Sequence, residues 1–145
     1  MTDKKLLRKG VIAAISSLFF YVALPYVIYV KYLAQYPEFG VEKYIDWIIR
    51  MGIVISGINF FKSASSSKSV RQAIGDLLLS IVYLIFFFKL FTLEVTVNVP
   101  ETNVMVSISM QGFIYIYLLA ALVGIFANIV KVAEVWASAG RSRSL

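Results

Sequence analysis

Asp46 and Arg50 are spaced so that their side chains can meet within one apolar stretch of the sequence. Residues four apart lie on the same face of a helix, where a carboxylate and a guanidinium can form an ion pair. If this stretch crosses a membrane, the pair is a functional candidate, because an intramembrane charge is costly unless it is paired. Lys89 closes another apolar stretch, and together with Arg50 it would attract an anion or a lipid phosphate. The alternative is that Arg50 and Lys89 extend to the membrane surface as anchors.

A second group of polar residues falls at similar depth in the apolar stretches. If these side chains converge, they form an inner polar cluster that could hold a proton or a cation, with Asp76 as its only charge. The alternative is a set of hydrogen bonds that hold the helices together, which polar side chains in membranes commonly provide. The members of this candidate cluster are Ser56, Asn59, Asp76, Ser80 and Asn128, with Ser16 and Ser17 from the first stretch.

Small residues recur four apart in several of the stretches, among them Gly52 with Ser56 and Ala120 with Gly124. Such pairs let two helix backbones approach closely. We interpret these four residues as helix-packing positions.

The composition excludes many kinds of chemistry. The chain contains no cysteine and no histidine, which excludes disulfides, thiolate metal sites and catalytic triads that use histidine. No glycine-rich phosphate loop, HExxH or GxSxG motif occurs, and the carboxylates near the apolar stretches, Asp46, Asp76 and Glu134, fall on separate helices at different depths. General acid–base catalysis needs such groups positioned together. We therefore expect no enzyme, no cofactor and no metal site.

These candidate residues must be positioned by membrane-spanning helices. Of the 145 residues, 60% are hydrophobic and 15% are charged, whereas soluble domains are about 45–50% apolar and about 25% charged. A run of about 20 apolar residues crosses the hydrocarbon core. The sequence predicts an all-α integral membrane protein, a four-transmembrane-helix bundle within a single domain (1–145), with spans at about 10–32, 44–61, 73–92 and 111–130. Pro25 should kink the first span, because proline removes a backbone hydrogen bond.

The segment 93–110 breaks the helical pattern. Valine and isoleucine alternate with polar residues on both sides of a turn sequence, Pro100 to Asn103, which is typical of two paired strands. We predict a small extracytoplasmic β-hairpin between helices 3 and 4 that caps the bundle. The last residues, 138–145, are predicted to be a mobile tail.

The distribution of positive charge predicts the topology. Lysine and arginine concentrate in the N-terminal residues, in the loop from Lys62 to Arg71 and in the C-terminal segment from Lys131. The positive-inside rule then places both termini in the cytoplasm of a multi-pass protein in the cell membrane. The net charge of +6 follows from this bias, and no segment outside the membrane is long enough for a nucleic-acid surface.

Two functional hypotheses remain, and no motif identifies a known four-span family. In the first, the chain is an accessory or structural subunit that packs against other integral membrane subunits, because its spans are uniformly apolar and such helices can face lipid or other spans. In the second, it self-associates into an ion channel or small-solute carrier that uses Arg50, Lys89 and Asp76. The two hypotheses differ in whether those three charges face a common path or lie at the membrane surfaces.

Overall fold

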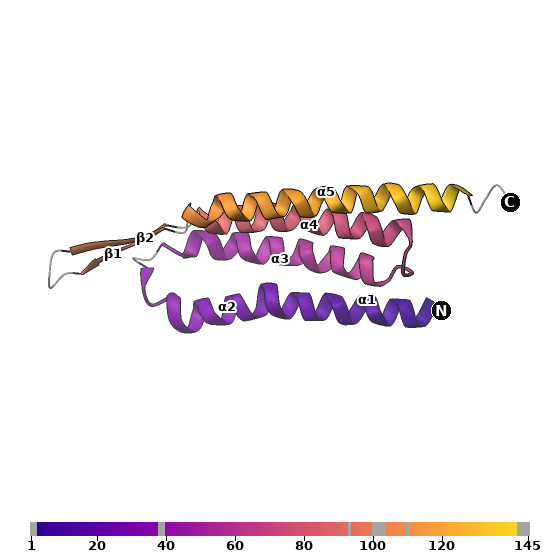
Figure 1. Cartoon of the computed structure of the whole chain (residues 1–145). Helices are drawn as coiled ribbons and strands as arrows, with labels where there is room; N and C mark the ends of the chain where they lie inside the picture. Colours follow the sequence, from indigo (N-terminus) through magenta and orange to yellow (C-terminus); the bar gives the residue numbers. More distant parts are fainter. Residues whose placement is uncertain (1–2, 38–39, 93, 100–103, 110, 142–145) are drawn as a thin grey trace.

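The computed structural model describes residues 3–37, 40–92, 94–99, 104–109 and 111–141. It consists of helices and one pair of strands. The helices run alongside one another, and the strands lie beyond one end of them (Figure 1). The elements are α1 (Asp3–Leu18), the π-helical turn η1 (Phe19–Ala23), α2 (Leu24–Ile28), the π-helical turn η2 (Tyr29–Leu33), α3 (Glu42–Ser63), α4 (Val70–Phe91), β1 (Glu94–Val99), β2 (Val104–Ser109) and α5 (Gln111–Arg141).

In the described part of the chain, four helices are long and apolar enough to cross a membrane: Asp3–Leu33, Glu42–Ser63, Val70–Phe91 and Gln111–Gly140. The prediction of four helical spans is therefore confirmed, and the chain has the character of a multi-pass membrane protein. The first of these helices, here called the first span (Asp3–Leu33), contains 31 residues. At 1.5 Å per residue it is about 46 Å long, so its basic N-terminal turns extend beyond a hydrocarbon core of about 30 Å.

The C-terminal helix is also longer than predicted. Residues 138–141, which were assigned to a mobile tail, continue α5 to Arg141, so this part of the prediction is wrong. The reason is local: Ala137, Ser138 and Ala139 carry small side chains that do not interrupt a helix, and Ser138 Oγ donates to the carbonyl of Val135. Residues 142–145 of the predicted tail lie outside the described residues.

Pro25 lies between two π-helical turns. Proline has no N–H to donate to the carbonyl four residues earlier, here that of Tyr21. In the preceding turn the N–H of Leu24 bonds to the carbonyl of Phe19, and in the following one the N–H of Ala34 bonds to the carbonyl of Tyr29. The first span remains a continuous helix through these wider turns (Figure 1). The predicted disturbance at Pro25 thus takes the form of local π-helical widening.

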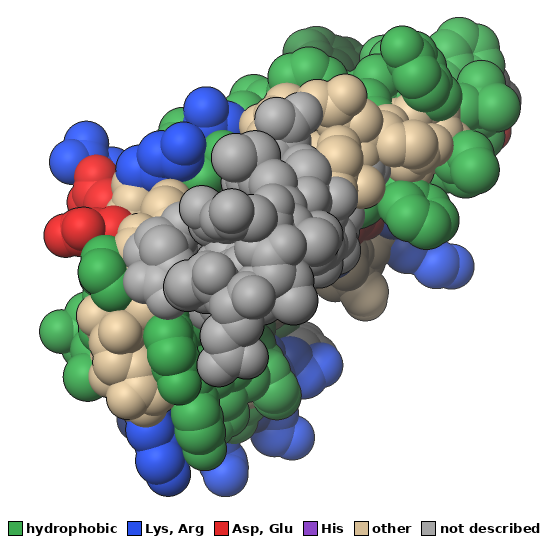
Figure 2. Space-filling view, turned by 90° about the vertical axis from the view of Figure 1, so that its left-hand side faces the viewer, with side chains coloured by type: hydrophobic (Ala, Val, Ile, Leu, Met, Phe, Trp, Pro, Cys, Tyr) green, Lys and Arg blue, Asp and Glu red, His purple; other side chains and the backbone are tan. Residues whose placement is uncertain are grey.

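The helices pack one after another rather than around a closed core. The main contacts join the first span to α3, α3 to α4, and α4 to α5. Figure 2 looks toward the end that carries the strands, and the molecule has an elongated outline in this view. The small core consists of Ile55, Leu79 and Phe86, with Tyr21 and Tyr83 packed against it. We call this arrangement an open bundle, because α5 touches the rest of the chain mainly through α4.

Gly52 allows the first span to approach α3 at the π-helical turn. A Cβ atom at position 52 would lie 2.5 Å from the carbonyl oxygen of Tyr21, the same carbonyl that Pro25 leaves without its usual donor. Glycine is the residue that permits such close backbone contact. Gly10 and Gly75 play similar parts, since an added Cβ would lie 2.8 Å from the Cβ of Ala64 and of Lys62, respectively.

The segment between α4 and α5 pairs as two antiparallel strands. Glu94 lies opposite Ser109 and Val99 lies opposite Val104, so the paired backbone lies within the range 93–110. The strands project past the ends of the helices (Figure 1). They do not lie across the bundle as the predicted cap would. The spanning part of the protein is entirely helical.

The contact at Gly52 generates a stability prediction. Gly52→Ala should destabilise the protein by about 1–3 kcal/mol, because the new methyl group collides with the Tyr21 carbonyl. The free energy of unfolding can be measured by titrating detergent-solubilised protein with sodium dodecyl sulfate while following helicity.

Gly57→Ala is the matched control on the same helix, since a Cβ at position 57 meets no atom within 4 Å. It should leave stability unchanged or raise it by about 0.5–1 kcal/mol, the helical preference for alanine. Equal destabilisation by both substitutions would show that the close approach at Gly52 does not matter.

Candidate functional site

Asp76 connects three helices through its carboxylate. Its Oδ1 lies 2.6 Å from Nζ of Lys62, in the last turn of α3, and its Oδ2 lies 2.5 Å from Nζ of Lys131 on α5. The side chain of Asp76 is 15% exposed. Gly75 precedes it and lets the stem of Lys62 lie directly against α4, which brings the ammonium group to the carboxylate. We call Lys62, Asp76 and Lys131 the inner triad.

The charges of the inner triad determine what it can bind. One carboxylate and two ammonium groups sum to +1, and each carboxylate oxygen already accepts from one lysine. A cation would therefore approach a group of net positive charge, which is unfavourable in a medium of low dielectric constant. The geometry favours the interpretation of Asp76 as a link between helices over its interpretation as a cation site.

A ladder of polar contacts continues from the inner triad along α4 and α5. Ser80 Oγ donates to the backbone carbonyl of Asp76 at 3.0 Å, and Asn128 Nδ2 donates to Ser80 Oγ at 2.7 Å. Further along, the hydroxyl of Tyr117 donates to the carbonyl of Tyr83 at 2.7 Å. Hydrogen bonds of this kind hold helices together where lipid removes the hydrophobic driving force. The ladder attaches α5, which has few buried residues, to α4.

A separate pair of polar side chains joins the first span to α3. Asn59 Nδ2 donates to Ser17 Oγ at 2.8 Å. Ser56, which is buried, donates to the carbonyl of Gly52 on its own helix at 2.7 Å. The residues predicted as one inner cluster therefore form two groups, with Ser17 and Asn59 in one and Asp76, Ser80 and Asn128 in the other. Ser16 is exposed and belongs to neither.

The outer charged residues form separate contacts on α3. Asp46 and Arg50 form the expected ion pair at 2.9 Å, but their side chains are 65% and 74% exposed on α3. Lys89 lies with its Nζ 5.9 Å from the ring centroid of Tyr44, where Lys43 also lies, at 5.2 Å. In the described residues no ion pair links Lys89 to the pair on α3. The structure thus shows the Asp46–Arg50 pair and the separate contact of Lys89 with Tyr44, and the anion site of Asp46, Arg50 and Lys89 stays a prediction.

The predicted helix-packing residues divide in the same way. Gly52 and Ser56 are buried between α3 and its neighbours. Ala120 is exposed, and a Cβ at Gly124 would meet no atom within 4 Å. The small residues of α3 therefore serve close packing within the chain, whereas those of α5 do not.

Sequence reasoning missed the two lysines that hold Asp76. A signal for them exists: Lys62 closes the second predicted span, Lys131 follows the fourth, and Asp76 lies just inside the start of the third. All three residues therefore fall at the same boundary of the bundle. The tyrosines Tyr21 and Tyr83, whose hydroxyls lie 3.1 Å apart, were also missed, because tyrosine in a span suggests an interface as readily as a core.

No cluster suited to a metal ion occurs in the described ranges, as judged by groups of three or more histidine, cysteine, aspartate or glutamate side chains. The chemistry available at the inner triad is electrostatic and hydrogen-bonding. It can position helices and present a positive charge at one end of the bundle.

The inner triad leads to a second prediction. Asp76→Asn should lower the free energy of unfolding by about 2 kcal/mol or more, because two partly buried lysines then face each other without a carboxylate. Asp46→Asn is the matched control on an exposed pair and should cost about 0–1 kcal/mol. Unfolding in mixed micelles measures both.

A double-mutant cycle identifies the partner. Lys131→Gln should destabilise the wild-type protein but cause no further loss in the Asp76→Asn background, where the ion pair is already lost and the substitution removes one of the two facing lysines. Additive effects of the two substitutions would contradict the contact.

Comparison with known proteins identified no relative of this chain. No family model matches the chain, and neither a search of curated proteins nor a search of solved structures found a match. The functional interpretation therefore depends on the contacts, charges and exposed surfaces of the chain itself.

Proposed function

We propose that the chain is a non-catalytic accessory or structural subunit of a larger membrane complex. In this proposal it is a multi-pass protein of the cell membrane with both termini in the cytoplasm. One end of the bundle carries three basic segments: the N-terminal turns, the loop between α3 and α4, and the C-terminal part of α5 (Figure 1). The positive-inside rule predicts that such an end faces the cytoplasm.

The observation that carries the proposal is the exposure of α5. In the most apolar window of this helix no residue is buried inside the chain. Its large side chains cover the surface around the helix, apart from the strip that contacts α4. The large hydrophobic residues of α5 that are more than half exposed are Phe113, Tyr115, Ile116, Leu119, Leu122, Val123, Phe126 and Trp136. A helix with one neighbour and such a surface suits packing against the spans of another protein.

The polar groups of the same helix support a structural role. Tyr117, Asn128 and Lys131 each bond to α4. The polar side chains of the ladder are therefore engaged within the chain and do not face a path for ions or solutes. Arg50, Lys89 and Asp76, the charges required by the channel or carrier hypothesis, lie in three different environments.

The strands offer a second attachment in this proposal. A two-stranded sheet has two outer edges, and an edge can pair with a strand of another chain. With the termini in the cytoplasm, β1 and β2 lie on the extracytoplasmic side, where they extend beyond the helices (Figure 1). A partner with an extracytoplasmic domain would fit there.

Site-specific photo-crosslinking in native membranes tests the subunit proposal. A photoreactive phenylalanine at position 115, where tyrosine is 79% exposed, should give adducts with larger membrane proteins that mass spectrometry can identify. The same group at position 117 is the matched control, because Tyr117 faces α4. It should give few or no intermolecular adducts.

The outcomes separate the two functional classes. Adducts of position 115 with a defined larger protein, recovered with it in gentle detergent, support the accessory subunit. Adducts between copies of this chain alone would overturn the proposal and favour a homo-oligomer. Adducts with lipid alone would also count against it.

Arg50 provides an independent test, because the exposed pair on α3 is the observation that most favours the alternative of a homo-oligomeric channel or carrier. Under the proposal, Arg50→Ala lowers the abundance of the complex and leaves the activity per assembled complex unchanged. The measurement is complex recovery together with ion flux in liposomes. Normal assembly with lost flux would support the channel or carrier.

A further inference from the structure

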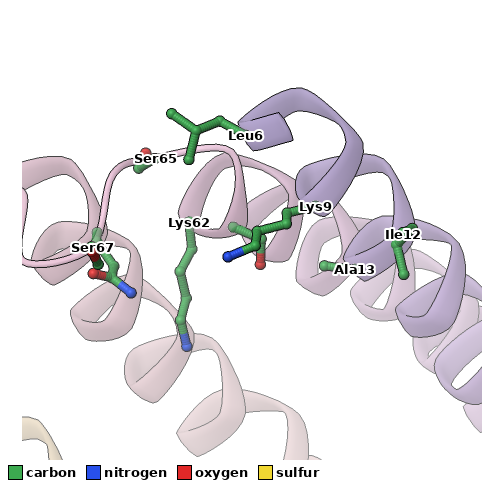
Figure 3. A pocket seen from close by; sticks show the side chains of 9 residues that line it. Leu6, Lys9, Ile12, Ala13, Lys62, Ser65 and Ser67 are labelled. Atoms are coloured by element: carbon green, nitrogen blue, oxygen red, sulfur yellow. The ribbon is translucent and has the colours of Figure 1, made fainter. Parts of the chain in front are cut away.

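A pocket of about 420 Å³ opens at the basic end of the bundle, between α1, the end of α3 and the loop that follows it. Figure 3 shows this pocket, with Lys9 reaching from α1 toward the stem of Lys62. Lys9 directly precedes the predicted first span and Lys62 closes the second. The pocket therefore lies at the boundary between hydrocarbon and headgroups if the helices cross a bilayer as proposed.

The polar part of the pocket offers hydrogen-bond donors. Lys9 contributes an ammonium group and forms no ion pair among the residues that the structure describes. Ser63 and Ser67 contribute hydroxyl groups. The side-chain oxygen of Gln72 accepts from the backbone N–H of Lys68 at 2.8 Å, so its NH2 group remains available as a donor.

The opposite side of the pocket is apolar. Three residues of α1 line it: Leu6, Ile12 and Ala13. Ile12 is about half exposed on the surface of the helix. No carboxylate is among the described residues that line the pocket, and the nearby Asp76 is paired with two lysines within the inner triad. A ligand that fits carries a negative oxygen-rich group and an apolar portion next to it.

We propose that this pocket binds the phosphate of an anionic phospholipid. Lys9 holds the phosphate by charge, Ser63, Ser67 and Gln72 donate hydrogen bonds to its oxygens, and the apolar wall contacts the start of the acyl chains. The aliphatic part of the Lys62 side chain lines the pocket, while its ammonium group forms the ion pair with Asp76. The lipid thereby contacts both the first span and α3, the pair of helices joined at Gly10 and Gly52.

Native mass spectrometry of the full chain in gentle detergent tests the proposal. The protein is titrated with phosphatidylglycerol, with phosphatidylcholine, and with phosphatidylglycerol in the presence of inorganic phosphate. We expect retention of one phosphatidylglycerol, weaker retention of phosphatidylcholine, and no displacement by millimolar phosphate. Removal of one lysine–phosphate contact weakens binding by about fivefold, which is the loss expected for Lys9→Gln.

Matched variants separate the pocket from the general positive charge of this end. Arg8→Gln removes the same charge one residue away from Lys9, and Arg8 does not line the pocket. Ser67→Glu places a carboxylate in the pocket, whereas Ser66→Glu places the same charge beside it. Lys9→Gln and Ser67→Glu should weaken phosphatidylglycerol retention, while Arg8→Gln and Ser66→Glu should not. Circular dichroism confirms that each variant is folded.

Three results would overturn the proposal. Equal losses for Lys9→Gln and Arg8→Gln would show attraction to the basic surface as a whole. Equal retention of phosphatidylcholine would show that the negative headgroup is not recognised. Displacement by inorganic phosphate would assign the pocket to a soluble anion. None of these results depends on the subunit proposal, because that proposal is tested by crosslinking from position 115 on α5, away from the pocket.

Discussion

The carboxylate of Asp76 on α4 forms ion pairs with Lys62 of α3 and Lys131 of α5, the two helices that flank α4. Inside a bilayer, apolar side chains gain little by leaving lipid for protein, so helices associate through close packing and hydrogen bonds. Asp76 supplies such a contact on both sides of α4 at once. Further along the same interface, α5 is attached to α4 by the Asn128–Ser80 and Tyr117–Tyr83 bonds and by packing of Tyr117 on Phe87 and Phe91.

The first span depends on a different constraint. Pro25 deprives the carbonyl of Tyr21 of its usual donor, the helix widens there, and Gly52 of α3 has room to approach that carbonyl. The same span is attached further along by the bond between Ser17 and Asn59. A proline, a glycine and one polar pair thus position a helix that is otherwise largely exposed. The small core of Ile55, Leu79 and Phe86 lies between these two regions of contact.

An open bundle of this kind has functional consequences. The first span packs mainly on α3, with Tyr21 also reaching Tyr83 of α4, and α5 packs mainly on α4. Both helices therefore present wide apolar surfaces to lipid or to other spans. The basic end, by contrast, contains the inner triad and the adjoining pocket, where positive charge meets hydroxyl groups and an apolar wall. The proposed partner surface and the proposed lipid site therefore lie on different parts of the molecule, and one can be removed without the other.

The number of long apolar helices, their approximate positions and the ion pair of Asp46 with Arg50 could all be predicted from sequence. Those features follow from local rules: the length of apolar runs and the spacing of residues on one helix. Hydrogen bonding between helices by Ser17, Asn59, Asp76, Ser80 and Asn128 was one of two alternatives that the sequence offered for these residues. The tertiary contacts were needed to show which helices these residues join and that Lys62 and Lys131 share Asp76. Apolar spans have no polar outward face that would reveal which side meets a neighbour, so pairing depends on close contacts such as those at Gly52 and Gly75. Those contacts exist only once two helices have met.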